Sequence, residues 1–189
     1  MGVLIYTETE NGKFKKSAFE LASYGRALAD QMGVELIAAC FNAQEVQMLA
    51  TYGVDKVILI KNQALETFTA PQYASNIAAM AQQHNAQMIV LSSSANAKYM
   101  AGMLAAKINA GYVSNVVELP KFESNITVKR TAFSNKAFSY TTLQSDTLIL
   151  GLSSNAYGAV ENKVNSEIVA FQPDLPEQTT TQTQASQAS

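Results

Sequence analysis

The sequence is short of charged side chains. Lys, Arg, Asp and Glu make up 15% of its 189 residues, whereas about 25% is usual for a globular domain. The formal net charge is -2 at pH 7. A chain with so few cations has no broad positive field to attract nucleic-acid phosphates or anionic lipid. We therefore expect neither a nucleic-acid-binding protein nor a membrane-bound one.

Cysteine and histidine are represented by one residue each, Cys40 and His84. A single cysteine cannot form an internal disulfide, and Cys40 lies in an apolar run where a buried thiol behaves as a small hydrophobic group. A zinc or iron-sulfur site needs several such ligands, so we expect no metal site. His84 follows an expected helix, where an imidazolium interacts favourably with the helix dipole.

The sequence also lacks targeting signals and the motifs of catalysis. It has no cationic leader and no apolar run of the ~18 residues that cross a membrane, so we expect a cytoplasmic protein. The motifs GxSxG, GxGxxG and GxxxxGK[ST] are absent, which argues against a nucleophile elbow or a glycine-rich phosphate loop. Glu8 and Glu10 follow the first expected strand, and we interpret both as solvated surface acids. We therefore predict no catalytic residues and no enzyme activity.

One loop remains a weak candidate for a ligand site, and its polar residues are Ser92, Ser93, Ser94 and Asn96. The loop follows an expected strand and opens an expected helix, a place where α/β folds bind anions on helix amides. Serine is also a preferred helix N-cap residue, and capping is the interpretation that we favour. The alternative is a nucleotide-binding module that holds AMP or ATP here, like a universal stress protein.

Apolar runs and helical patterns alternate through the first 120 residues. Short apolar runs predict strands at 3–6, 34–41, 56–60, 88–91 and 113–119. Helical periodicity covers 14–32, 43–51 and 71–84, and a further helix follows Ser94 and is closed by Gly111. This alternation is typical of βαβ units, so we predict a three-layer α/β domain with a mostly parallel sheet.

The pattern changes after residue 120. Segments at 126–130, 137–142, 147–152 and 168–171 read as strands without an intervening helix, and we predict that they form an antiparallel β extension after the fifth strand. Residues 177–189 contain no large aliphatic or aromatic side chain and cannot bury enough apolar surface to fold. We therefore expect a folded domain over 1–171 and a disordered linker or truncated tail over 172–189.

Four passages in order resemble the N-terminal domain of the alpha subunit of electron transfer flavoproteins. They are VLIYTE at 3–8 with NGK at 11–13 and the helix containing Ser17, Glu20, Leu21 and Ala27; GVDKV at 53–57; the strand 88–91 followed by LAAK at 104–107 and AG at 110–111; and RTAF at 130–133 with KA at 136–137. Three positions differ from the residues usual in the family: Met103 replaces arginine, Asn115 replaces aspartate and Asn135 replaces glycine.

The resemblance implies both a fold and a function. The fold would be Rossmann-like, of the adenine nucleotide alpha hydrolase-like type. The domain would pack against the beta subunit of a heterodimer and support the mobile FAD domain during electron transfer from dehydrogenases to a quinone-linked acceptor. FAD would be held by a C-terminal domain that has no counterpart after Phe171, so we expect no cofactor in this chain alone. The partner or interdomain interface would include Arg130, Asn135 and Lys136.

Overall fold

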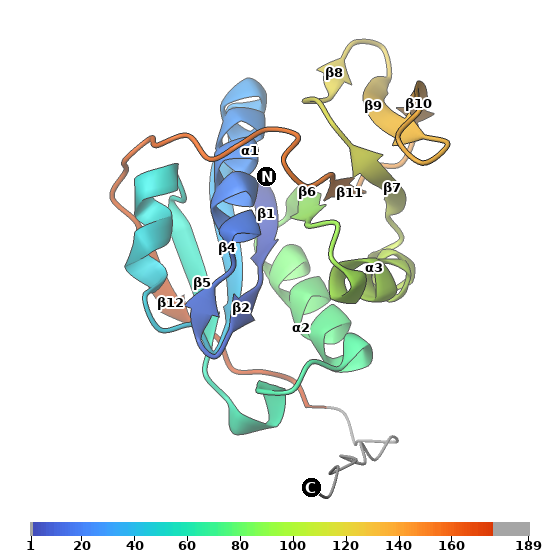
Figure 1. The fold of residues 1–189 in the computed structure, drawn as a ribbon. Coiled ribbons are helices and arrows are strands. Elements are labelled where there is room, and N and C mark those ends of the chain that lie inside the picture. Colours follow the sequence, from blue (N-terminus) through green and yellow to red (C-terminus); the bar gives the residue numbers. More distant parts are fainter. Residues whose placement is uncertain (1, 176–189) are drawn as a thin grey trace, which may run out of the picture.

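The computed structural model describes residues 2–175. The strands are β1 (Gly2–Thr7), β4 (Glu35–Phe41), β5 (Lys56–Ile60), β6 (Ala86–Leu91), β7 (Gly111–Val116), β8 (Lys121–Phe122), β9 (Ile126–Ala132), β10 (Ala137–Leu143), β11 (Leu148–Leu152) and β12 (Glu167–Ala170). They form one mixed sheet in the order β10-β9-β7-β11-β6-β1-β4-β5-β12, with β8 beside β9 (Figure 1). A small separate hairpin is made by β2 (Thr9–Glu10) and β3 (Lys13–Phe14). From β7 to β12 the neighbouring strands are parallel.

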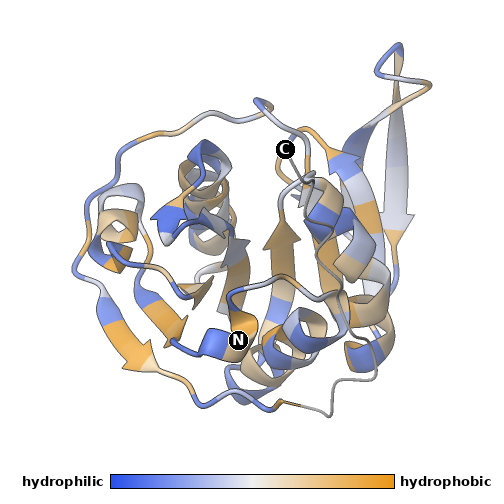
Figure 2. Cartoon of the chain, turned by 60° about the horizontal axis from the view of Figure 1, so that its bottom comes forward, coloured by the Kyte–Doolittle hydropathy of each residue, from blue (hydrophilic) through white to orange (hydrophobic). Residues whose placement is uncertain are grey.

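Helices cover both faces of the parallel part of the sheet. They are α1 (Lys16–Met32), α2 (Ala70–Gln83) and α3 (Ala95–Ile108), with the short 3-10 helices η1 (Val46–Tyr52) and η2 (Gln63–Leu65). One buried cluster joins α1 and η1 to the sheet, and a second joins α2 and α3 to its other face. Figure 2 shows the hydrophobic central strands between these helices. The predicted three-layer α/β fold with a mostly parallel sheet is confirmed.

Local sequence signals explain where most helices begin and end. Pro71 lies in the first turn of α2, where a missing backbone N–H costs nothing. Gly33 and Gly53 end α1 and η1 with positive φ angles of 67° and 89°, which glycine adopts without strain. The prediction that Gly111 closes α3 is wrong. Asn109 closes it in the left-handed conformation, and Gly111 instead begins β7.

The antiparallel extension is smaller than predicted. It contains β8, β9 and β10. β8 and β10 each pair antiparallel with β9, which joins the sheet through the β7–β9 pairing. The segment at 147–152 is β11, a parallel strand between β6 and β7. The segment at 168–171 forms β12, which is parallel to β5 at the opposite edge. All five residues of β11 are buried, so this strand needs helices on both faces, which only the centre of the sheet provides.

A long segment over 153–166 connects β11 in the centre of the sheet to β12 at its edge. It passes over α1, as the orange trace in Figure 1 shows. Glu20 of α1 accepts hydrogen bonds from the backbone N–H groups of Asn155, Tyr157 and Gly158 at 2.9–3.1 Å. Ser23 Oγ, one turn further along α1, donates to Val160 O and accepts from Val160 N. Two polar side chains of α1 therefore hold the crossing segment in place.

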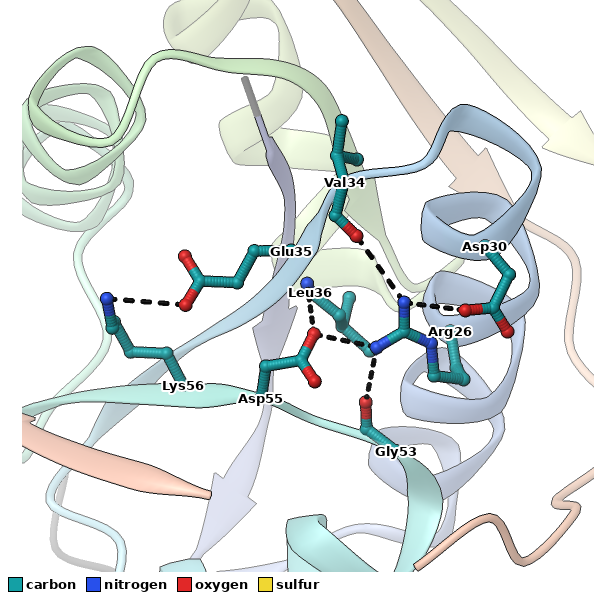
Figure 3. Close-up of polar contacts among 8 residues, drawn as sticks. All are labelled: Arg26, Asp30, Val34, Glu35, Leu36, Gly53, Asp55 and Lys56. Atoms are coloured by element: carbon teal, nitrogen blue, oxygen red, sulfur yellow. Dashed lines mark hydrogen bonds and ion pairs between the residues drawn. The ribbon is translucent and has the colours of Figure 1, made fainter. Parts of the chain in front are cut away.

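A second polar cluster joins α1 to the start of β5 (Figure 3). Arg26 Nη1 donates to Asp55 Oδ2 at 2.7 Å and to Gly53 O at 3.2 Å, while Nη2 donates to Val34 O at 3.4 Å. Asp55 Oδ2 also accepts from Leu36 N at 2.8 Å. A Cβ added at Gly53 would lie 2.6 Å from Arg26 Cδ, so glycine permits the close approach of the arginine. The cluster fixes α1 against the first residues of β4 and β5.

The described chain ends beside α2. Phe171 N donates to Leu59 O, and the backbone of Asp174 exchanges two hydrogen bonds with the Asn76 side chain, each 3.1 Å long. The greater part of the predicted linker, residues 176–189, lies outside the described residues. Between residues 2 and 175, no helix is long and apolar enough to cross a membrane.

Candidate functional site

A cavity of about 380 Å³ opens at the carboxyl ends of β1 and β4. From these two strands it is lined by Tyr6, Thr7 and Phe41. The strand β1 lies between β4 and β6. After β1 the chain forms β4 on one side of it and later forms β6 on its other side. Ligands of open α/β sheets bind at such a reversal of strand order. The cavity is therefore the candidate small-molecule site of this fold.

Aromatic rings form one wall of the cavity. The rings of Phe41 and Tyr73 stack with centroids 4.2 Å apart. The Tyr6 ring meets both of them edge to face, with centroids 5.8 Å and 6.0 Å away. Phe68 packs against Tyr73 at 4.9 Å. The sequence analysis missed this wall, although Tyr6 and Phe41 stand at the carboxyl ends of two expected strands.

Glu8 forms the polar side of the cavity and contradicts the prediction of a solvated acid. Only 4% of Glu8 is exposed. Its Oε2 accepts from Ser92 Oγ at 2.7 Å and its Oε1 from Ser94 Oγ at 2.8 Å. Glu10 is exposed, as predicted. Glu8 is buried because it continues the line of β1 toward the start of α3, where the two hydroxyl groups replace water.

The polar loop before α3 caps its own helix. Ser94 is the N-cap residue, and its Oγ accepts from Ala97 N at 3.0 Å. Ser92 Oγ accepts from Ser94 N at 3.2 Å. Ser93 Oγ lies 2.9 Å from Ser154 Oγ, outside this arrangement, and Asn96 is exposed and lines the cavity. The capping interpretation is confirmed for Ser94.

The Glu8 carboxylate stands where the alternative hypothesis would place a phosphate. A helix N-terminus attracts negative charge, and at α3 the carboxylate already supplies it. A nucleotide phosphate brought to Ser92 and Ser94 would lose their hydroxyl donors to Glu8 and meet a like charge at close range. This geometry disfavours AMP or ATP at the loop.

The predicted interface residues all lie on the β9–β10 hairpin but do not form one cluster. Arg130 is half-buried and belongs to the strand face that includes the buried Val128, because alternate residues of a strand share a face. Asn135 and Lys136 are exposed in the turn. Asn135 also lines a cavity of about 580 Å³ that includes Ser93 and Asn115. The structure thus brings Ser93 of the polar loop and Asn135 of the predicted interface to one cavity.

The face of the hairpin opposite Val128 carries aromatic side chains that sequence reasoning did not select, and Phe138 of this face also lines the cavity of Asn135. Phe138 and Tyr140 are each 62% exposed, and their spacing places them on one face of β10. Lys129 of β9 lies on the same face, with its Nζ 4.5 Å from the centroid of the Phe138 ring. The hairpin extends beyond the rest of the molecule (Figures 1 and 2). The signal available in the sequence was the pair of aromatic residues, Phe138 and Tyr140, at alternate positions of an expected strand.

The thiol of Cys40 is inaccessible, and this predicts alkaline instability. Cys40 is fully buried beside Thr7 Oγ1, 3.0 Å away, and burial raises the pKa of its thiol to about 12. An unfolded cysteine ionises near pH 8.5, so the neutral thiol stabilises the native state below that pH and loses this contribution as pH rises toward 12. Burial also raises the pKa of Tyr73 to about 12. We expect Cys40 to lower the free energy of unfolding by about 1.4 kcal/mol per pH unit between pH 8.5 and 12, and Tyr73 to add to the fall only above pH 10.

Urea unfolding between pH 8 and 11 measures this effect, and Cys40→Ala is expected to reduce the slope. At pH 8, a thiol reagent such as dithionitrobenzoate should label Cys40 only as fast as the protein unfolds. Labelling of the native protein at the rate of a free thiol would contradict the buried position.

Comparison with known proteins identifies relatives of the chain. The model of the electron transfer flavoprotein domain matches residues 3–180. The electron transfer flavoprotein subunit alpha of Bacillus subtilis is 27% identical over 72% of this chain and 42% of its own length. Protein FixB of Clostridium saccharobutylicum is 26% identical over 62% of this chain and 36% of its own length. The acryloyl-CoA reductase electron transfer subunit beta of Anaerotignum propionicum is 26% identical over 62% and 33%. The chain spans less than half the length of these relatives.

Proposed function

Because the chain belongs to the electron transfer flavoprotein family, as an N-terminal domain of the alpha-subunit type, we propose that it is a structural domain of an electron carrier rather than an enzyme. It packs against a beta-type subunit and supports the domain that holds FAD. The complex accepts electrons from dehydrogenases and passes them to a quinone-linked acceptor. The contribution of this domain is to set distances between electron donor and acceptor, which requires no catalytic side chain.

The observation that carries this proposal is the β9–β10 hairpin. Phe133, Phe138 and Tyr140 are all well exposed on it, whereas soluble monomers rarely keep large apolar side chains together in water without a partner. Aromatic residues are also enriched at the centres of protein interfaces. We propose that this hairpin contacts the beta-type subunit or the FAD domain.

Two polar atoms of β9 are buried without partners in the described part of the chain, residues 2–175. They are Arg130 Nε and Thr131 Oγ1. Thr131 pairs with Phe138 and shares the face of Phe138 and Tyr140, whereas Arg130 lies on the opposite face of β9, with Val128. We propose that Asn135 and Lys136 contact the partner through the exposed turn, and that Arg130 supports the hairpin from the face of β9 behind the aromatic residues.

Association with a beta-type subunit tests the proposal. The chain and its native beta-type partner are expected to form a heterodimer that is seen by size-exclusion chromatography with light scattering. The double variant Phe138→Ser, Tyr140→Ser is expected to weaken the complex at least about tenfold, because it removes two aromatic contacts. Isothermal titration calorimetry measures the change.

Tyr99→Ser is the control, because Tyr99 is 70% exposed but lies on α3, outside the hairpin. It is expected to leave the affinity unchanged. The proposal fails if the two proteins do not associate, or if the hairpin variant binds as tightly as the Tyr99 variant.

A further inference from the structure

Glu8 is a buried carboxylate that no cationic side chain pairs with in the described part of the chain. The ion pairs found among residues 2–175 involve other acids, and the two oxygens of Glu8 accept only from Ser92 and Ser94. A carboxylate oxygen has room for about two hydrogen bonds, so half of this capacity remains. Burying an unpaired charge is costly. Because Glu8 lines the cavity at the ends of β1 and β4, a cation in the cavity would neutralise it.

Tyr6 lines the same cavity, and its hydroxyl group is free to bind a ligand there. Tyr6 is 5% exposed, and its Oη forms no hydrogen bond with any described residue, in contrast to Tyr73 Oη, which donates to Leu65 O at 2.7 Å. Tyr6 and Glu8 are two residues apart along the line of β1, so their side chains project from the same face of the sheet. The phenol and the carboxylate therefore offer two adjacent acceptors to a ligand.

The remaining lining also suits a small cation. Tyr6, Phe41, Phe68 and Tyr73 line the cavity, so the carbon skeleton of a cation can pack against an aromatic wall. Two carboxylates, Glu8 and Glu66, and one ammonium, Lys15, line the cavity, which gives a net charge of one negative unit. The volume of about 380 Å³ lies at the lower end of the range for small-molecule pockets.

From these contacts we infer that the cavity binds a small organic cation, whose ammonium or guanidinium group pairs with Glu8 and hydrogen-bonds to Tyr6 while its carbon skeleton packs on Phe41 and Tyr73. The site selects against anions, because Glu8 holds the anion position at the start of α3. This binding is separate from the proposed role in electron transfer and needs no second subunit.

Calorimetric titration of the full chain with agmatine, methylguanidinium and ethylammonium tests the inference, with AMP as the anionic comparison. At least one of the three cations is expected to bind and to raise the melting temperature, while AMP does neither. Glu8→Gln keeps the size of the side chain and removes its charge, and it is expected to weaken cation binding about tenfold or more. Glu10→Gln, two residues away and exposed, is the matched control and is expected to bind like the unaltered chain.

Two further variants keep the test decisive if Glu8→Gln does not fold. Lys15→Met removes the competing ammonium and is expected to tighten cation binding several-fold, which a merely destabilised protein would not do. Tyr6→Phe removes only the free hydroxyl and is expected to weaken binding several-fold. The inference is overturned if none of the three cations binds at millimolar concentration, if AMP binds more tightly than they do, or if Lys15→Met leaves their affinity unchanged.

Discussion

Replacing Glu20 with alanine is expected to lower the free energy of unfolding by about 3 kcal/mol. The carboxylate accepts three backbone N–H groups of the segment that crosses α1, and Glu20 is buried. Water cannot fully replace these bonds in the packed native state, so the variant leaves donors without partners. The loss also frees the segment that leads to β12. Urea unfolding at neutral pH measures the stability change.

Hydrogen exchange distinguishes this local effect from general destabilisation. The amides of Asn155, Tyr157 and Gly158 are expected to exchange faster in Glu20→Ala under conditions where those of β1 do not. Glu161→Ala is the control, because Glu161 is exposed on the same segment, and surface substitutions change stability by about 0.5 kcal/mol or less. Equal stability of the two variants would show that Glu20 does not hold the segment.

Asp55→Ala is expected to destabilise the domain by about 2–3 kcal/mol. The substitution removes the carboxylate that accepts from Arg26 Nη1 at 2.7 Å and from Leu36 N at 2.8 Å (Figure 3). Removing one member of a fully buried ion pair costs about 3–5 kcal/mol. The side chain of Asp55 is 32% exposed, so solvent reduces the cost below that range.

Asp30→Ala provides the comparison within the same cluster. Asp30 also contacts Arg26 at 2.7 Å, but its side chain is 61% exposed, and exposed ion pairs contribute about 0–1 kcal/mol. We expect thermal and urea unfolding to rank the proteins as unaltered, Asp30→Ala and then Asp55→Ala, with the last clearly separated. If both variants lost the same stability, the burial of the Arg26–Asp55 pair would not be the cause.

Contacts between helix side chains and the backbone of distant segments support the scaffold proposal. Glu20 fastens the segment that carries the chain from β11 to β12, and Asp174 is hydrogen-bonded to Asn76 beyond β12. The backbone at Asp174 is therefore held beside α2. These contacts support the proposed scaffold role.

Sequence reasoning succeeded where the determinants are local. The apolar run at β1, the glycines that end α1 and η1, and Pro71 at the start of α2 each act within one turn or one strand. The family resemblance extended the prediction to the whole domain, because the matching sequence segments occur in the same order. The candidate site was harder to predict from the sequence, since Glu8 resembles any other acid in a polar loop.

The sequence by itself determined the alternation of strands and helices, the limits of most elements and the family. Only the tertiary structure decided that β11 enters the centre of the sheet as a parallel strand, and that Glu8 is buried against Ser92, 84 positions along the chain. The physical reason is the range of the interactions. Periodicity and capping express contacts between near neighbours, whereas strand pairing and the burial of a charge depend on which distant segments come together when the core forms.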